Sequence, residues 1–203
     1  MISDGAGSAI ITWNMIAGSP VTSWEVLAQK VDTSGTTLWG PGVSVGHKLT
    51  DELYPDIVSD GAGGAIITWF DRDDWNIYAQ MLDASGAPLW GTYGVGVCTY
   101  SHDQTNPRIT TDGAGGAIVA WEDRRDGWWG VYTQSVDLTG SLLWDPDGVA
   151  VCTVAGDQLE IQMVPDGGGG AVLTWEDYRS EQGIYAQRVD GGGAPLPPIC
   201  APP

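Results

Sequence analysis

The residues best suited to chemistry lie in loops that combine tryptophan, acidic and arginine side chains. An indole ring offers a flat apolar surface, and a guanidinium group beside it donates several hydrogen bonds. Sugar-binding sites and protein-binding hot spots both use this combination. The candidate ligand-binding residues are Trp24, Asp71, Arg72, Trp75, Asp123, Arg124, Arg125, Trp128, Trp129, Asp177 and Arg179. The alternative is that these tryptophans cap the loops and that each arginine pairs with an aspartate on the surface.

Motifs of catalysis and metal binding are absent from the sequence. The glycine clusters at 61–64 and 167–170 lie between two expected strands, which indicates hairpin turns and not phosphate-binding loops. His47 and His102 are not spaced as metal ligands. Carboxylates are so numerous that some pair lies at catalytic separation by chance, and most aspartates recur at a regular interval, as structural turn residues do. We therefore expect no catalytic residue, no metal site and no cofactor.

The elements that position these loops belong to a repeat that occurs four times. An Asp-Gly phrase ends in tryptophan each time, at Asp4–Trp13, Asp60–Trp69, Asp112–Trp121 and Asp166–Trp175. A second phrase follows at Val26–Gln29, Ile77–Gln80, Val131–Gln134 and Ile184–Gln187. A third phrase, Leu-Trp, occurs three times, at Leu38-Trp39, Leu89-Trp90 and Leu143-Trp144. Repetition at this interval is typical of solenoids and propellers.

Each repeat is expected to form four short antiparallel strands. Segments such as Ala65–Trp69 are β-branched and aromatic, and the Asp-Gly-x-Gly turns supply the positive φ that tight hairpins need. No segment shows an apolar period of 3.6 residues over a helical length. The sequence therefore predicts an all-β chain with one repeat domain over 1–203, a β-propeller of four four-stranded antiparallel blades at 1–50, 51–102, 103–156 and 157–203. The alternatives are a half-propeller that dimerises into a larger ring, and a β-sandwich.

Seven of the eleven tryptophans are expected to fill the core between blades. A single blade has two apolar faces, so stacking is needed to bury them. These residues are Trp13, Trp39, Trp69, Trp90, Trp121, Trp144 and Trp175. The first and last repeats lack parts of strands, and Pro197 stands where Trp90 stands in the second repeat, which leaves a homodimer as one way to close the ring.

The repeated phrases resemble tandem repeats of secreted and surface proteins of bacteria, which are interpreted as β-propeller blades. The resemblance rests on the Asp-Gly-x-Gly-Gly turn, the Trp-x-Asp-Arg segment and the Ile-Tyr-Ala-Gln segment, and it covers essentially the whole chain. The phrases are also loosely similar to the Asp-box hairpins of sialidase-type propellers, without their spacing. The resemblance implies an extracellular or cell-surface location in the parent protein, and it says little about function.

Charge and cysteine content limit the partners. The net charge of −18 would repel a nucleic acid or an anionic membrane, and no apolar run is long enough to span a bilayer. No basic and apolar leader precedes the repeats. Cys98 and Cys152 occupy the same position in neighbouring repeats, so we expect no disulfide between them; Cys200 is the third cysteine, and no Cys-x-x-Cys pair occurs.

These observations favour a non-catalytic binding or interaction module, with a protein or a carbohydrate as its partner. The alternative is a lectin-like carbohydrate binder with one site per blade. A glycoside-processing enzyme is the least favoured of the three, because no set of carboxylates departs from the repeat in the way that a catalytic set would.

Overall fold

The computed structural model describes residues 1–17, 23–46, 50–179 and 182–196. Within these ranges the chain forms sixteen strands and no helix. The strands make four separate four-stranded antiparallel sheets, which confirms the predicted all-β architecture of propeller blades. No described segment is a helix long and apolar enough to cross a membrane.

Each sheet takes its four strands from one continuous stretch of chain, in chain order. The first sheet holds β1 (Ile2–Ser3), β2 (Ala9–Ala17), β3 (Ser23–Val31) and β4 (Val43–Ser44). The second holds β5 (Glu52–Ser59), β6 (Ala65–Asp71), β7 (Asn76–Leu82) and β8 (Val95–Cys98). The third holds β9 (Gln104–Thr111), β10 (Ala117–Asp123), β11 (Gly130–Val136) and β12 (Val149–Cys152). The fourth holds β13 (Gln158–Pro165), β14 (Ala171–Asp177), β15 (Gly183–Val189) and β16 (Pro195–Leu196).

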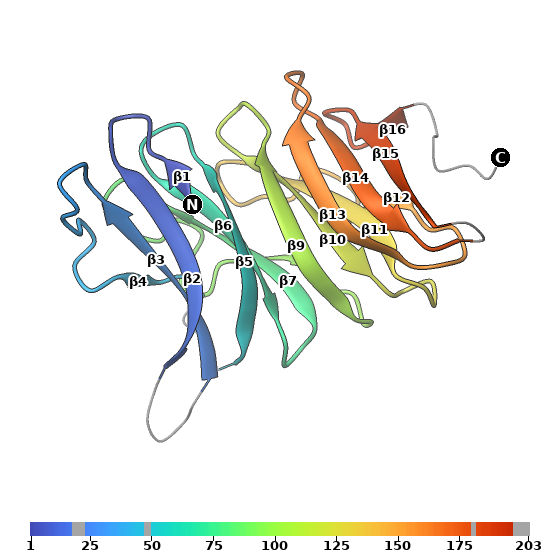
Figure 1. Ribbon diagram of the computed structural model, residues 1–203, viewed down its shortest axis with the longest axis horizontal. Coiled ribbons are helices and arrows are strands. Elements are labelled where there is room, and N and C mark those ends of the chain that lie inside the picture. The colour runs from blue at the N-terminus through green and yellow to red at the C-terminus, as the bar shows by residue number, and fades with distance from the viewer. Residues whose placement is uncertain (18–22, 47–49, 180–181, 197–203) are drawn as a thin grey trace.

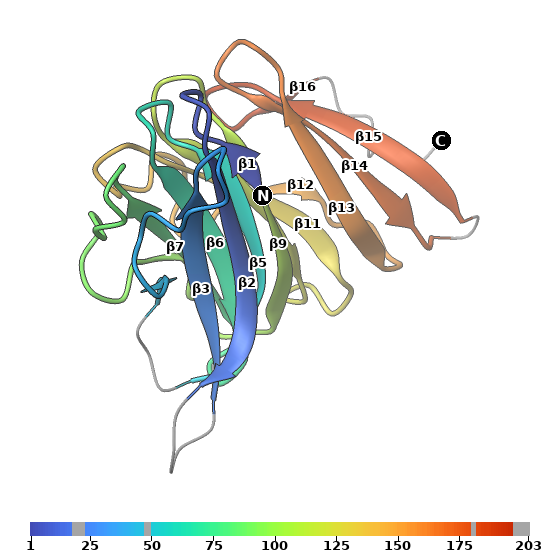
Figure 2. The ribbon, with the colours of Figure 1, turned by 60° about the vertical axis from the view of Figure 1, so that its left-hand side comes forward.

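The sheets stand side by side in chain order, with the first and the fourth at opposite ends (Figure 1). Their first strands, β5, β9 and β13, lie next to one another. We call this side, formed by the first strand of each sheet, the inner edge. The four sheets fan out from it, and the fourth sheet, with β15 and β16, lies at the end opposite to the first sheet (Figure 2).

The hairpin turns form because an aspartate satisfies the backbone of each one. Asp60 Oδ1 accepts the N–H groups of Ala62 at 2.7 Å and Gly64 at 2.8 Å. A Cβ on Gly64 would lie 2.1 Å from the carbonyl oxygen of Leu82, so no other residue fits there. The same turn recurs at Asp4, Asp112 and Asp166. The recurring aspartates are therefore structural, as the sequence indicated.

The core consists of three apolar layers, one between each pair of neighbouring sheets. Trp69, Trp121 and Trp175 are almost fully buried in these layers, and Trp39 and Trp90 are each 6% exposed. Trp13 and Trp144 are half-buried. The prediction that these seven tryptophans lie between blades is therefore confirmed for six of them, because the half-buried Trp144 packs against the layer between the third and fourth sheets. Trp13 is on the face of the first sheet that no described sheet covers, which explains its exposure.

The cysteines also follow the prediction. Cys98 is a free, buried thiol, and Cys152 is in a disulfide, so these two are not bonded to each other. Burial raises the pKa of the Cys98 thiol to about 12.

Candidate functional site

The structure divides the sequence-predicted ligand-binding residues into a buried and an exposed set. Asp71, Asp123 and Asp177 end the second strand of their sheets and are 0% exposed. Arg125 pairs with Asp123 at 2.6 Å, and the indole N–H of Trp121 donates to the same carboxylate at 2.9 Å. This ion pair is buried, whereas the alternative drawn from the sequence was a surface pair. Removing one partner would leave the other charge buried without its counter-charge.

The fourth sheet repeats this arrangement. Arg179 pairs with Asp177 at 2.6 Å, and Trp175 donates to Asp177 at 3.0 Å. Burial acts to raise the pKa of Asp177, but the hydrogen bonds from Arg179 and Trp175 outweigh burial, so that the pKa is lowered. The guanidinium of Arg179 also lies 4.2 Å from the centre of the Tyr185 ring. The Asp–Arg pairs of the third and fourth sheets therefore stabilise their hairpins.

Arg125 is held on three sides. Besides its pairing with Asp123, its guanidinium lies 4.4 Å from the ring of Tyr100 and 4.1 Å from the ring of Tyr132. It also donates to the carbonyl oxygen of Asp147 at 2.9 Å. These contacts leave Arg125 little freedom to meet a ligand.

The exposed set lies at the tips of the same hairpins. Trp75 is 41% and Trp128 is 51% exposed. The side chain of Arg72 is 58% exposed and lies 3.5 Å from Asp51. The exposed Arg124 lies over the ring of the half-buried Trp129 at 5.7 Å. Ligand binding by these residues stays a prediction.

Trp24 is the last of the predicted ligand-binding residues, and the two histidines were expected not to be metal ligands. Trp24 is half-buried in β3, and its backbone N–H donates to Asp51 at 2.9 Å. His102 is exposed and stacks on Tyr100 at 5.6 Å, whereas His47 lies outside the described residues. In the part of the chain that the structure describes, no three histidine, cysteine, aspartate or glutamate side chains are close enough to hold a metal ion.

A second cluster, which sequence reasoning missed, lies on the inner edge. Each of β5, β9 and β13 has a bulge, and one residue in each adopts left-handed backbone geometry: Tyr54 (φ 53°), Asn106 (φ 49°) and Glu160 (φ 57°). This geometry is costly for residues other than glycine and is concentrated at functional sites. The three residues share one repeat position but differ in type, so the position departs from the repeat. That departure is the signal that could have revealed the cluster.

Glu122 is the central residue of this cluster. It lies in β10 on the face toward the fourth sheet and is 2% exposed. Its Oε1 accepts the backbone N–H of Glu160 at 2.9 Å, and its Oε2 accepts the amide N–H of Asn106 at 2.8 Å. The carboxyl group thus connects two neighbouring sheets. We call Asn106, Glu122 and Glu160 the acid cluster.

Burial is the main reason that the pKa of Glu122 is raised, to about 7. The Glu160 carboxyl acts in the same direction, whereas the donors on Asn106 and Glu160 and the charge of Arg108 act against it. Arg108 is held in place because its Nε donates to the carbonyl oxygen of Ile161 at 3.1 Å. Glu122 therefore exchanges its proton near neutral pH, next to the exposed Glu160.

The other sheets carry different chemistry at the position of Glu122. In the second sheet this position is Phe70, which stacks with Tyr54 at 6.2 Å and contacts the Trp75 ring at 5.4 Å. In the fourth sheet it is Glu176, which accepts a hydrogen bond from the Tyr178 hydroxyl at 2.8 Å. Among the described sheets, the pair formed by a buried glutamate and an exposed glutamate of the inner edge therefore lies between the third and the fourth sheet.

Comparison with known proteins identifies the fold. No family model matches the sequence, and no curated protein matches it. The structure is similar to an α-L-arabinanase from Penicillium chrysogenum, solved with arabinobiose, with a TM-score of 0.53 and 15% identity over 88% of this chain. The chain spans 56% of the length of that arabinanase.

Two further solved structures are similar at lower scores. An endo-arabinase from Bacteroides thetaiotaomicron has a TM-score of 0.47 and 15% identity over 89% of this chain and 70% of that one. An exo-1,5-α-L-arabinanase from a bovine ruminal metagenomic library has a TM-score of 0.47 and 12% identity over 94% of this chain and 74% of that one. The fold is of the β-propeller type.

These comparisons correct the expected function. The sequence favoured a non-catalytic module, with a lectin-like binder as the alternative and no enzyme activity. That expectation is contradicted by the similarity of the fold to that of a solved α-L-arabinanase. No local motif in the sequence marks the acid cluster, because its residues come from β9, β10 and β13 of two sheets.

Proposed function

We propose that this chain forms part of a glycoside-processing β-propeller, and that the acid cluster carries the chemistry. The observation on which the proposal rests is the pair of Glu122, buried with a pKa of about 7, and Glu160, exposed on the inner edge. The fold shared with an arabinanase supports it. The substrate class that we propose is an arabinose-containing oligosaccharide.

The two glutamates suit the two roles that cleavage of a glycosidic bond needs. One carboxylic acid must keep its proton near neutral pH and give it to the leaving oxygen, and a second carboxyl group must activate water or attack the sugar. Burial makes Glu122 a suitable proton donor, as for other glutamates in apolar surroundings. Glu160 meets solvent and is the group that we assign to the second role.

Access to Glu122 depends on Asn106. The Glu122 carboxyl is almost fully covered, and Asn106 occupies its Oε2. The proposal therefore requires the Asn106 amide to move aside when the sugar binds, so that Oε2 can reach the leaving oxygen. Arg108, half-buried on the same strand, donates hydrogen bonds at this edge and suits the hydroxyl groups of a sugar.

The test is release of reducing ends from arabinobiose and longer arabino-oligosaccharides by the purified chain. Replacing Glu122 or Glu160 by Gln should lower the rate by about 10²-fold or more, because each substitution removes proton transfer or the attacking carboxyl. Glu25→Gln is the matched control, since Glu25 lies on β3 away from the acid cluster, and it should keep the full rate.

Thermal melts must show that all variants are folded. Glu122→Gln and Glu160→Gln proteins that are as active as the unaltered chain would overturn the assignment. An unaltered chain that releases no sugar from any of these substrates would overturn the proposed substrate class.

A further inference from the structure

The three interfaces between neighbouring sheets are built from the same repeat positions. On the third strand, Val26, Ile77 and Val131 face the next sheet and are each 0% exposed. Ile184 holds this position in the fourth sheet and is 72% exposed. Similarly, Ile10, Ile66 and Ile118 of the second strand are 0% exposed, whereas Val172 of the fourth sheet is half-buried. The fourth sheet therefore presents an uncovered copy of a surface that binds a sheet three times in this chain.

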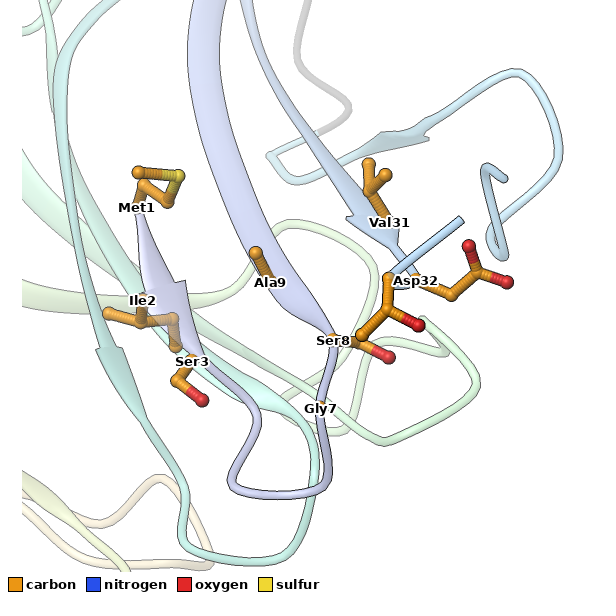
Figure 3. A pocket seen from close by; sticks show the side chains of 9 residues that line it. Met1, Ile2, Ser3, Gly7, Ser8, Ala9, Val31 and Asp32 are labelled. Atoms are coloured by element: carbon orange, nitrogen blue, oxygen red, sulfur yellow. The ribbon is translucent and has the colours of Figure 1, made fainter. Parts of the chain in front are cut away.

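The first sheet presents the opposite half of the same interface. Ala65, Ala117 and Ala171 are 0% exposed against the preceding sheet, but Ala9 is half-buried. Leu82, Val136 and Val189 are 0% exposed, but Val31 is half-buried. Ala9 and Val31 line an open pocket of about 520 Å³ with Met1 and Ile2, and Figure 3 shows their side chains around it.

A glycine cradle shows that this face of the first sheet is shaped for a neighbour. The rings of Trp39, Trp90 and Trp144 lie against glycines of the following sheet, within 2.9 Å of an ideal Cβ on Gly86 and Gly140 and 2.7 Å on Gly193. Each indole N–H donates to a carbonyl oxygen beside the glycine, on Ala84, Leu138 and Gly191. Gly35 holds this position in the first sheet with nothing within 4 Å.

We propose that the uncovered face of the fourth sheet binds the uncovered face of the first sheet of a second copy of this chain. A second copy is the expected occupant because these two faces are the two halves of an interface that the chain already makes three times. Their apolar positions are those that pack against each other at the three internal interfaces. The contact is therefore head to tail. When the fourth sheet of each copy binds the first sheet of the other, the two contacts form a closed dimer with a twofold axis.

The acid cluster is compatible with this contact. Tyr54, which shares the repeat position of Glu160, is 54% exposed although its sheet has neighbours on both faces. Glu160 is accordingly expected to stay accessible from the inner edge when a second copy is bound.

Two features make the new contact weaker than the internal interfaces. The position of Trp39, Trp90 and Trp144 is Pro197 in the fourth repeat, so the cradle at Gly35 receives no indole ring from this partner. In addition, each copy carries a net charge of −18, and like charges repel. Added salt screens this repulsion and should therefore strengthen the association.

The test is sedimentation equilibrium of the purified chain over a range of protein concentrations, at low and high salt. The expected result is a species of twice the 21.4 kDa chain mass that forms as the protein concentration rises, and that forms at lower protein concentration in high salt. Ile184→Arg should weaken the association by about tenfold or more, because it places a charge in the apolar face. Leu89→Arg is the matched control, since Leu89 is 52% exposed on an inner sheet, and it should leave the association unchanged.

A mixing experiment distinguishes head-to-tail contact from other pairings. Met15, 44% exposed, is on the open face of the first sheet, so Met15→Arg alone should also weaken self-association. Mixed together, the Ile184→Arg and Met15→Arg proteins keep one intact face each and should associate with each other. A chain that is monomeric at every concentration and salt, or a mixture that associates no better than its components, would overturn the proposal.

Discussion

Glu122→Gln tests the energetic consequence of burying a carboxyl group in the acid cluster. The pKa of Glu122 is raised from its ordinary 4.5 to about 7. The folded protein therefore binds this proton more tightly than the unfolded chain, and stability falls as the pH rises through the window from about 4.5 to 7. The full effect is about 3 kcal/mol above pH 7, from about 1.4 kcal/mol for each pH unit of difference.

The glutamine side chain keeps the shape of the glutamate without its charge. Its oxygen can accept the N–H of Glu160, and Asn106 can turn its amide oxygen toward the new NH₂ group. We therefore expect Glu122→Gln to change the free energy of unfolding little at pH 5, and to raise it by about 3 kcal/mol relative to the unaltered chain at pH 8. Urea unfolding of both proteins at the two pH values measures this difference.

Asn106→Ala provides a second check on the same reasoning. Asn106 donates to the carboxylate and lowers the pKa of Glu122, so its removal should extend the loss of stability to higher pH and make it larger, while the loss still begins near the ordinary pKa of 4.5. A free-energy difference between Glu122→Gln and the unaltered chain that is the same at pH 5 and pH 8 would refute the argument, because it would mean that Glu122 does not change its protonation in this window.

Three further perturbations examine the fold. Trp121→Ala should lower the free energy of unfolding by about 3–5 kcal/mol because the ring is 0% exposed, whereas Trp128→Ala should lower it by less than about 1 kcal/mol. Denaturant unfolding of the two variants measures the difference, and equal losses would place Trp128 in the core. Gly140→Ala and Gly35→Ala both place alanine at φ +85°, which costs about 1–2 kcal/mol, but only Gly140→Ala drives a Cβ to 2.9 Å from the Trp90 ring. Gly140→Ala should therefore lower the free energy of unfolding by about 1–3 kcal/mol more than Gly35→Ala does. Equal melting temperatures of the two variants would contradict the close contact between Gly140 and the Trp90 ring. Cys98 should resist thiol reagents at pH 8 in the folded protein and react once the protein is unfolded without reductant; rapid reaction of the folded protein would contradict its burial.

Local sequence predicts most of this fold because the determinants of its turns and strands are local. The Asp60 carboxylate forms hydrogen bonds within its own hairpin, so the Asp-Gly phrase marks the turn wherever it occurs. Burial of the recurrent tryptophans also follows from the repeat, since each sheet needs an apolar face on both sides. Trp13 differs because its exposure depends on which sheets are present as neighbours.

The site residues were harder to predict because their partners are distant in sequence. The burial of Arg125 depends on Tyr100 and Tyr132, which come from a different loop and a different strand. The environment of Glu122 depends on the backbone of Glu160 in the next sheet. In a single sequence Glu122 looks like one more acid in an acidic loop, and only the stacking of sheets reveals its burial.

The central claim, that Glu122 donates the proton in glycoside cleavage, is tested most directly by the pH dependence of arabino-oligosaccharide hydrolysis. The rate should fall as the pH rises above about 7, where Glu122 loses its proton. In Asn106→Ala, which removes a hydrogen bond that lowers this pKa, the fall should move to higher pH. An alkaline limb at the same pH in both proteins would contradict the assignment.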